Sequence, residues 1–66
     1  MSNWFTETRI NWILENIRIF GTMRREYICE KFGISIPQAS IDIKEAINRD
    51  DKIIYNKSTK QYEYEK

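Results

Sequence analysis

The stretch Gly33-Ile34-Ser35-Ile36-Pro37-Gln38-Ala39-Ser40-Ile41-Asp42-Ile43-Lys44 decides the fold of this chain. Glycine adopts the left-handed conformation that ends a helix at no steric cost, so Gly33 is expected to close the preceding helix. The Ser35 hydroxyl can accept a hydrogen bond from a free backbone N–H and cap the next helix. Pro37 then falls in the first helical turn, where its missing N–H costs no hydrogen bond. The pattern predicts the turn and the second helix of a helix-turn-helix.

The helix after this turn is expected over about residues 36–48 and has two unlike faces. Apolar residues recur at helical spacing and predict one buried stripe, formed by Ala39, Ile43, Ala46 and Ile47. The opposite face is short-chained, polar and methyl-bearing, and consists of Pro37, Gln38, Ser40, Ile41 and Lys44. Side chains of these kinds suit the edges of base pairs in the major groove of DNA.

Two segments resemble a known family. The run Gly33-Ile34-Ser35-x-Pro37-Gln38-Ala39-Ser40-x-Asp42-Ile43 and the later Tyr55-x-x-Ser58-x-Lys60-x-Tyr62 are similar to the domain that opens many bacterial WYL-domain repressors, and more distantly to DeoR-type repressors. The resemblance runs from about Arg9 to Tyr62. It implies an α+β winged helix-turn-helix, with three helices followed by a two-stranded β-hairpin wing. The family usually adds a WYL ligand-sensing domain and a dimerising tail. This sequence of 66 residues leaves no room for them, so no small-molecule effector is expected.

Two further helices are expected before the turn. The first should run over about residues 6–19, after a short arm or opening turn at residues 1–5, with Thr6 or Thr8 as its cap. Its apolar face comprises Ile10, Ile13, Leu14 and Ile17. The second helix should run over about residues 23–32 with Thr22 as its cap, and it should turn inward Tyr27, Ile28 and Phe32.

The pattern of residues 52–65 predicts the β-hairpin wing. Residues 52–56 and 61–65 alternate in the manner of strands, and residues 56–60 form a polar, charged hairpin loop between them. Tyr55, Tyr62 and Tyr64 either pack the wing onto the helices or form a stacking surface. The whole chain, residues 1–66, is therefore expected to be one winged helix-turn-helix domain.

The composition is that of a small globular protein. Hydrophobic residues make up 41% and charged residues 32%, which favours a folded domain over disorder. No apolar run approaches the roughly 20 residues that span a membrane. The N-terminus lacks the basic start and apolar core of a signal peptide, so we expect a cytoplasmic protein, in a bacterial cell or a phage-infected host.

The sequence offers no catalytic or metal-binding constellation. It contains no histidine, which is the commonest general base and metal ligand. Cys29 has no partner at ligand spacing and is expected to be a small, semi-buried apolar residue. Asp50 and Asp51 are expected to lie in a solvated turn. We expect no enzyme activity, metal ion or cofactor.

The expected function is sequence-specific binding of double-stranded DNA by a small transcriptional regulator, a repressor. Gln38 is the first candidate for base contact, because its carboxamide can pair bidentately with adenine. Ser40 can reach a base or a phosphate. Ile41 is either a tolerated surface residue or a contact for a thymine methyl group.

Contacts to the DNA backbone are expected from a second set of side chains: Arg24, Arg25, Ser35, Lys44, Lys57, Ser58 and Lys60. The two arginines either lie free in solvent or meet phosphate, since a helix-turn-helix commonly lays the start of this helix across the backbone. The formal net charge is only +1, and Glu26, Glu30 and Asp42 lie in the same segments. We therefore expect modest non-specific affinity.

Three aromatic residues near the N-terminus are more than the small expected core should require. Trp4, Phe5 and Trp12 either cover a small core or form a homodimer contact, because exposed aromatic side chains mark interfaces. A homodimer is favoured because one winged helix contacts only a few base pairs.

Two other functions remain open. A nearly neutral winged helix can serve as a protein-interaction module, such as an antirepressor or an accessory subunit. It can also be an architectural DNA binder of the phage-excisionase kind, and such short regulators suit phages and mobile elements. The salt dependence of duplex binding separates DNA binding from protein interaction, and DNA bending separates a regulator from an architectural protein.

Overall fold

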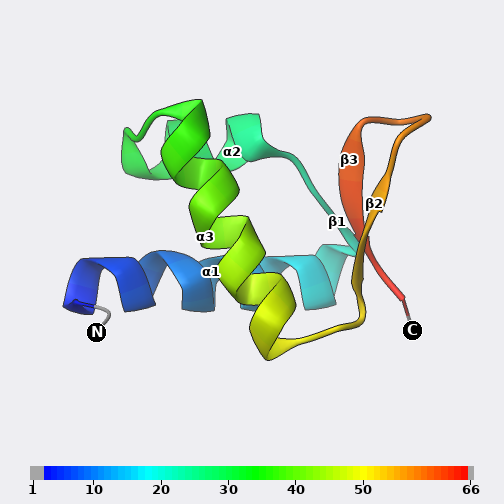
Figure 1. Ribbon diagram of the computed structural model, residues 1–66, viewed down its shortest axis with the longest axis horizontal. Helices are drawn as coiled ribbons and strands as arrows, with labels where there is room; N and C mark the ends of the chain where they lie inside the picture. Colours follow the sequence, from blue (N-terminus) through cyan, green and yellow to red (C-terminus); the bar gives the residue numbers. More distant parts are fainter. Residues whose placement is uncertain (1–2, 66) are drawn as a thin grey trace.

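The computed structural model describes residues 3–65, which form three helices and a small sheet (Figure 1). The order along the chain is α1 (Trp4–Phe20), β1 (Thr22–Met23), α2 (Arg25–Phe32), α3 (Ile36–Arg49), β2 (Ile53–Asn56) and β3 (Gln61–Tyr64). The helix α3 crosses α1, and the sheet stands beside the C-terminal end of α1. This is the α+β winged helix-turn-helix that the sequence predicts. Within residues 3–65, no helix is both long and apolar enough to cross a membrane.

The first helix begins earlier than expected, because its cap is Asn3 and not Thr6 or Thr8. The Asn3 side-chain oxygen accepts a hydrogen bond of 2.8 Å from the Thr6 N–H, and the Thr8 hydroxyl donates to the Trp4 carbonyl at 2.9 Å. Asparagine is among the strongest N-caps, so Trp4 and Phe5 belong to the first turn of α1. Met1 and Ser2, which belong to the expected arm, lie outside the described residues.

The prediction that Thr22 caps α2 is wrong. Gly21 ends α1 with a φ of 84°, and Thr22 and Met23 continue as the short strand β1, paired with Glu63 and Tyr62 of β3. The cap position of α2 is Arg24, which makes no side-chain capping bond. The wing hairpin consequently extends to a three-stranded antiparallel sheet in the order β1-β3-β2.

The turn before α3 has the geometry that its sequence predicts. Gly33 has a φ of 66°, and its N–H donates to the Cys29 carbonyl at 2.7 Å, which closes α2. The Ser35 hydroxyl accepts from the Gln38 N–H at 3.3 Å, and Pro37 lies in the first turn of α3. Local chemistry therefore sets the direction in which α3 leaves the turn.

The core lies where α1, α2, α3 and the sheet meet. Its buried apolar side chains are Ile10, Ile13, Leu14, Ile17, Met23, Ile28, Ala39, Ile43, Ala46 and Ile53. The predicted faces of α1 and α3 are confirmed, with Ile47 partly buried at the edge. Tyr27 was expected to face inward, but its side chain is 52% exposed. The eight-residue α2 presents Ile28, Cys29 and Phe32 to the core, and Cys29 is half-buried as the sequence predicts.

Asp50 does not lie in the free, solvated turn that the sequence suggests. It is the C-cap residue of α3, and its carboxylate accepts hydrogen bonds from Arg18 of α1 and from the Tyr64 hydroxyl of β3. Its backbone N–H donates to the Ala46 carbonyl at 2.9 Å. This carboxylate therefore joins α1, α3 and the wing, and it holds the sheet against the helices.

Candidate nucleic-acid interface

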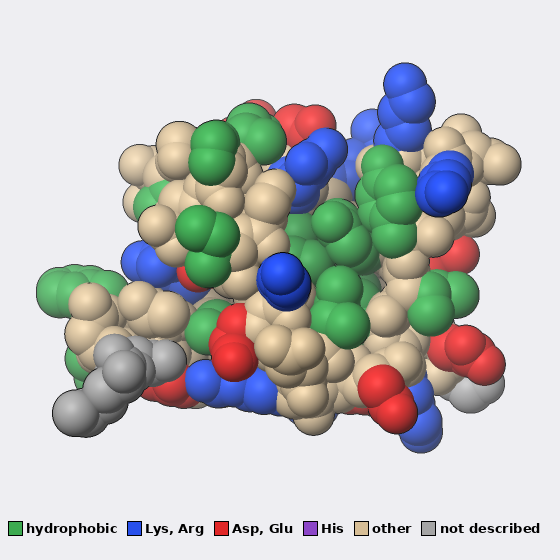
Figure 2. Space-filling view, in the orientation of Figure 1, with side chains coloured by type: hydrophobic (Ala, Val, Ile, Leu, Met, Phe, Trp, Pro, Cys, Tyr) green, Lys and Arg blue, Asp and Glu red, His purple; other side chains and the backbone are tan. Residues whose placement is uncertain are grey.

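The outward face of α3 contains Ile41 and Lys44, two of the side chains predicted to meet DNA, whereas Gln38, predicted on the same face, lies on the flank toward α1. Pro37, Ile41 and Lys44 are exposed along it, and the Ile41 side chain is 61% exposed. Asn48, one turn after Lys44, is also exposed and was missing from the predicted set. Basic side chains lie over α3 and along the upper part of the wing, with apolar side chains between them (Figure 2).

Ser40 and Arg25 connect the outward face of α3 to the start of α2. The Arg25 guanidinium donates a hydrogen bond of 3.3 Å to the Ser40 hydroxyl, and both side chains are partly buried. The bond is slightly longer than the usual N–H···O range. The structure thus places one predicted base-contact residue beside one predicted phosphate contact.

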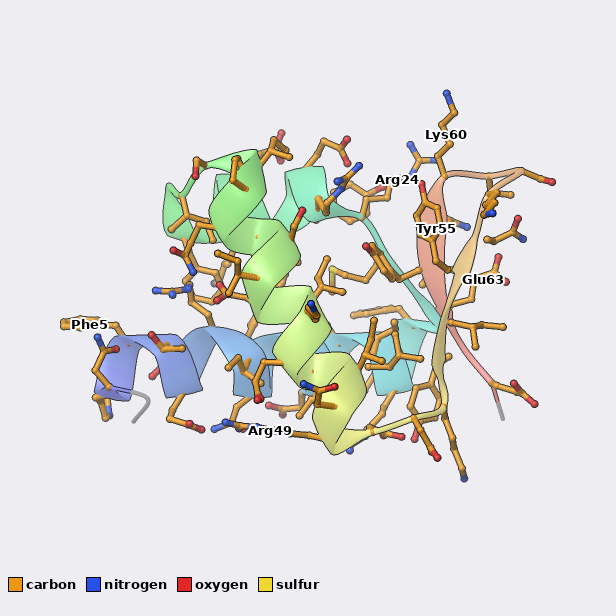
Figure 3. The ribbon with its side chains drawn as sticks, viewed as in Figure 1. Phe5, Arg24, Arg49, Tyr55, Lys60 and Glu63 are labelled. Carbon is orange, nitrogen blue, oxygen red and sulfur yellow. The ribbon has the colours of Figure 1, made fainter. Side chains whose placement is uncertain are left out.

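Arg24 faces the wing. Its Nε donates to the Gln61 side-chain oxygen of β3 at 3.4 Å. Figure 3 shows Arg24, Tyr55 and Lys60 at the same upper edge of the sheet. The two arginines at the start of α2 therefore point in different directions, one toward α3 and the other toward the wing.

The wing tip is shaped by Asn56. Its side-chain oxygen accepts from the backbone N–H groups of Ser58 at 2.9 Å and of Thr59 at 3.3 Å. Lys60 closes the loop with a φ of 57° and an N–H bond of 2.8 Å to the Asn56 carbonyl. The side chains of the predicted wing contacts, Lys57, Ser58 and Lys60, are exposed. Asn56 is a positioning residue, and an asparagine at the start of a hairpin loop is the signal for it.

The three wing tyrosines divide between two roles. Tyr62 and Tyr64 pack against the core, as the packing alternative predicts. Tyr55 is 42% exposed, and its ring centroid lies 4.8 Å from that of Tyr62. Tyr55 is therefore the solvent-exposed member of an aromatic pair, and it lies next to the basic side chains of the wing.

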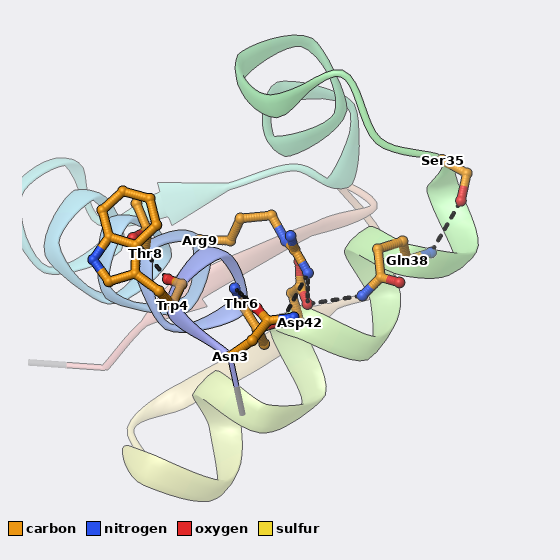
Figure 4. Close-up of polar contacts among 8 residues, drawn as sticks. All are labelled: Asn3, Trp4, Thr6, Thr8, Arg9, Ser35, Gln38 and Asp42. Atoms are coloured by element: carbon orange, nitrogen blue, oxygen red, sulfur yellow. Dashed lines mark hydrogen bonds and ion pairs between the residues drawn. The ribbon is translucent and has the colours of Figure 1, made fainter. Parts of the chain in front are cut away.

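Gln38 lies on the flank of α3 that faces α1, and its carboxamide is already hydrogen-bonded. Its Nε2 donates to the Asp42 carboxylate at 3.1 Å, and Asp42 in turn accepts from Arg9 of α1 (Figure 4). The Asp42 side chain is 1% exposed. Gln38 and Asp42 are four residues apart and are therefore neighbours on the helix. The sequence thus indicates the Gln38–Asp42 part of this contact but not the part made by Arg9.

A second pair of charges connects the same two helices at the far end of α3. The Arg49 guanidinium donates to both Glu7 carboxylate oxygens, at 2.8 and 2.7 Å. These two bonds hold the arginine toward α1, and they also raise the pKa of Arg49. Lys44, by contrast, is exposed at the centre of the outward face.

The three aromatic residues near the N-terminus do not form one cluster. Trp4 and Phe5 are 72% and 67% exposed and meet edge to face, with centroids 5.2 Å apart. Trp12 is half-buried and packs edge-on against Phe32 at 5.5 Å. Phe5 lies at the end of α1 farthest from the wing (Figure 3). Only Trp12 therefore covers the core.

This chain is similar in sequence to known DNA-binding repressors. No known family profile matches it. It is 34% identical over 62 residues to the DNA-binding transcriptional repressor CapW of Escherichia coli strain KTE188, a match that covers 92% of this chain and 21% of the repressor. It is 41% identical over 44 residues to CapW of Pseudomonas aeruginosa, which covers 67% of this chain and 15% of that repressor. The chain thus spans about a fifth or less of the length of these curated relatives.

Proposed function

We propose that this chain is a sequence-specific double-stranded DNA-binding protein and a transcriptional repressor, which inserts α3 into the major groove. The observation that carries the proposal is that the exposed outward face of α3 lies on the same face of the molecule as basic side chains from the start of α2 and from the wing (Figures 2 and 3). Arg24 and Arg25 lie at the start of α2, and Lys57 and Lys60 lie at the wing tip. The similarity to CapW, a DNA-binding transcriptional repressor, supports the same functional class.

In this proposal Gln38, Ser40 and Ile41 contact bases. Ile41 is the most exposed of the three and brings a methyl group that can meet the methyl group of thymine. Ser40 reaches a base edge once Arg25 turns to a phosphate. Gln38 approaches the groove from the flank of α3 that faces α1.

The backbone contacts come from three places around α3. Ser35 and Lys44 act from α3 itself, Arg24 and Arg25 from the start of α2, and Lys57, Ser58 and Lys60 from the wing. Free N–H groups at the start of α2, whose cap position Arg24 makes no side-chain capping bond, add to the attraction for phosphate. These contacts set the position and register of α3 and add no sequence preference of their own.

We also propose that the protein acts as a homodimer formed through α1. Phe5, Trp12 and Ile19 follow one another at seven-residue spacing and therefore share a face of the helix. Phe5 and Ile19 are 67% and 64% exposed, and the neighbouring Trp4 and Phe20 are each 72% exposed. Phe5 and Ile19 are symmetric about Trp12, so two antiparallel copies of α1 would match Phe5 with Ile19. Such an interface is self-complementary, as a two-fold dimer requires.

The direct test is titration of labelled duplex at two salt concentrations, with the duplex taken from selection in a random pool. DNA binding should weaken with salt by about 0.9 log unit per released contact for each log unit of salt. A protein-interaction module would bind duplex at neither concentration, which would refute the proposal. Sharp bending of the duplex without preference for the selected sequence would point instead to an architectural protein.

A further inference from the structure

We propose that the groove between α1, β1 and α2 is filled by the Phe5 side chain of a second copy of this chain. The inference rests on the homodimer of the proposed function, and it names the surface that the exposed start of α1 meets on its partner. Because such a dimer is two-fold symmetric, each copy contributes one Phe5 side chain and one groove.

The groove is a mainly apolar recess with a volume of 460 Å³. Its aromatic residues are Trp12 and Phe20 of α1 and Tyr27 of α2, and Met23 of β1 also lines it. Met23 is 3% exposed, whereas Phe20 and Tyr27 are 72% and 52% exposed. Apolar side chains therefore surround a space that is large enough for an aromatic ring and that residues 3–65 leave open.

The chemistry of the groove favours an uncharged, apolar occupant. Burial of apolar surface stabilises a complex, and aromatic rings gain further from edge-to-face contacts with one another and from contact with a methionine sulfur. The two charged residues that line the groove, Glu30 and Lys31, have opposite signs and leave no net charge to attract an ion. A phenylalanine ring matches these surroundings.

Phe5 cannot enter the groove of its own chain. Phe5 and Phe20 belong to one helix, and 15 residues at 1.5 Å per residue place them about 22 Å apart along its axis. The Phe5 side chain is 67% exposed, and its described ring contact is with Trp4. A contact between Phe5 and the groove therefore requires a second copy.

The antiparallel arrangement of two α1 helices brings Phe5 to the groove of the partner. When Trp12 of one copy faces Trp12 of the other, Phe5 lies opposite Ile19. Asn16, one turn before Ile19, and Phe20, directly after it, both line the groove. On a helical wheel Phe5, Asn16 and Phe20 lie on the same side of Trp12, and a two-fold axis perpendicular to the plane of the two helices places that side on one face of the dimer. The Phe5 ring is therefore directed at the mouth of the partner's groove.

The facing residues of α1 present no electrostatic obstacle to this arrangement. All of them are uncharged, and their positions are symmetric about the central tryptophan: Phe5, Thr8, Trp12, Asn16 and Ile19. Glu7 and Arg18 of the same helix are paired with residues of α3 and of its C-cap. Antiparallel packing also sets the positive N-terminus of one α1 near the negative C-terminus of the other. The surface is thus compatible with a second copy of itself.

The contact can be detected by NMR in a mixture of isotope-labelled and unlabelled copies of the intact chain. At a concentration where light scattering shows a dimer, isotope-filtered NOE spectra should contain cross-peaks between the Phe5 ring of one copy and the Met23 methyl group of the other. The Trp12–Phe32 ring contact, at 5.5 Å within one chain, is the control and should be absent from the filtered spectra. A dimer without Phe5–Met23 cross-peaks would overturn the inference and leave the groove to a different occupant.

The affinity of the dimer gives an independent measure. Phe5→Ala and Phe20→Ala should each raise the dimer dissociation constant by about tenfold or more, because buried aromatic side chains are frequent hot spots of interfaces. The variant with both changes should raise it by less than the product of the two single effects, since both remove the same contact. Ile54→Ala, at an exposed position of β2, is the control and should leave the constant unchanged. Independent, multiplicative effects would contradict the contact, because the two residues are too far apart in one chain to couple.

The result for the groove is separable from the result for DNA binding. A chain that stays monomeric at tens of micromolar would refute the dimer and the groove contact together, whereas duplex titration would still decide the DNA-binding function. Circular dichroism should show the wild-type helix content in both single variants, since Phe5 and Phe20 are 67% and 72% exposed. If either variant unfolds, the NOE measurement on the wild-type protein decides the question.

Discussion

The Tyr64 hydroxyl donates a hydrogen bond of 2.8 Å to the Asp50 carboxylate and so joins the last strand of the wing to the end of α3. The Arg18 guanidinium of α1 donates to the same carboxylate oxygen, also at 2.8 Å. The Tyr64 bond, followed by the Arg18 bond, lowers the pKa of Asp50. Three elements that are separated along the chain therefore meet at one ionised group.

This relationship predicts a specific loss of stability in acid. The folded-state pKa of Asp50 lies below its ordinary value of 3.8, so the stabilisation is present above that value and is lost as the pH falls through the folded-state pKa. Asp50→Asn should flatten the decline of the urea midpoint below about pH 4 relative to the wild-type protein. Asp51→Asn, at the exposed neighbouring position, is the control and should keep the wild-type profile. An unchanged profile in Asp50→Asn would show that the contact does not stabilise the fold.

The wing tip should contribute charge to DNA binding but little to stability. Lys57→Gln combined with Lys60→Gln should weaken binding to all duplexes about equally and reduce the salt slope by about 1–2 units, because two phosphate contacts are lost. The thermal midpoint should stay the same, since both side chains are exposed. Lys52→Gln, at the base of the wing, is the matched control. A slope identical to that of the wild-type protein would place the wing tip away from DNA.

Ile41 should recognise a thymine methyl group. Ile41→Ala should reduce the affinity for the best duplex by roughly 1 kcal/mol, the order of magnitude for one or two buried methyl groups. Replacing the contacted thymine with uracil should weaken wild-type binding similarly and leave Ile41→Ala unaffected. Because Ile41 is 61% exposed, the variant should be as stable as the wild-type protein. If uracil weakens both proteins equally, Ile41 does not touch the methyl group.

The outward face of α1 should control the oligomeric state. Trp4→Ala combined with Phe5→Ala should give a folded monomer with weaker binding to paired half-sites, because the described ring contact of each residue is with the other. Trp12 is left intact because it packs against Phe32 in the core. Ile54→Ala removes an exposed apolar residue from β2 as the control. Light scattering that finds the intact protein monomeric at tens of micromolar would contradict the proposed dimer.

The core of α3 should tolerate little change. Ile43 is 1% exposed, so Ile43→Ala should lower the free energy of unfolding by about 2–5 kcal/mol, from lost burial and the cavity left behind. A domain of this size has a small margin of stability, so the variant should be largely unfolded at elevated temperature. Ile54→Ala, at a residue that is 46% exposed, should change stability by about 0.5 kcal/mol or less. If urea titration shows that Ile43→Ala and Ile54→Ala lower the free energy of unfolding equally, the two positions are equally buried in solution.

The sequence alone determines the helix-turn-helix, because the signals there are local. A left-handed glycine at Gly33, the Ser35 cap and the proline in the first turn each act within a few residues of where they stand. The buried stripe of α3 is also visible in the sequence, since helical periodicity converts spacing directly into a face. The hairpin loop follows from Asn56 and the alternation on either side of it. These features need no knowledge of the rest of the chain.

The tertiary structure decides what depends on residues that meet from distant parts of the chain. Thr22 and Met23 become a strand only because the edge of β3, far later in the sequence, supplies hydrogen-bond partners for their backbone. Tyr27 stays at the surface because the short α2 has room for few side chains in the core. The Gln38 carboxamide points where it does because Arg9, 33 residues from Asp42 in sequence, pairs with that carboxylate. A local pattern limits which face a side chain occupies, but its hydrogen-bond partner and orientation depend on which other element packs against it.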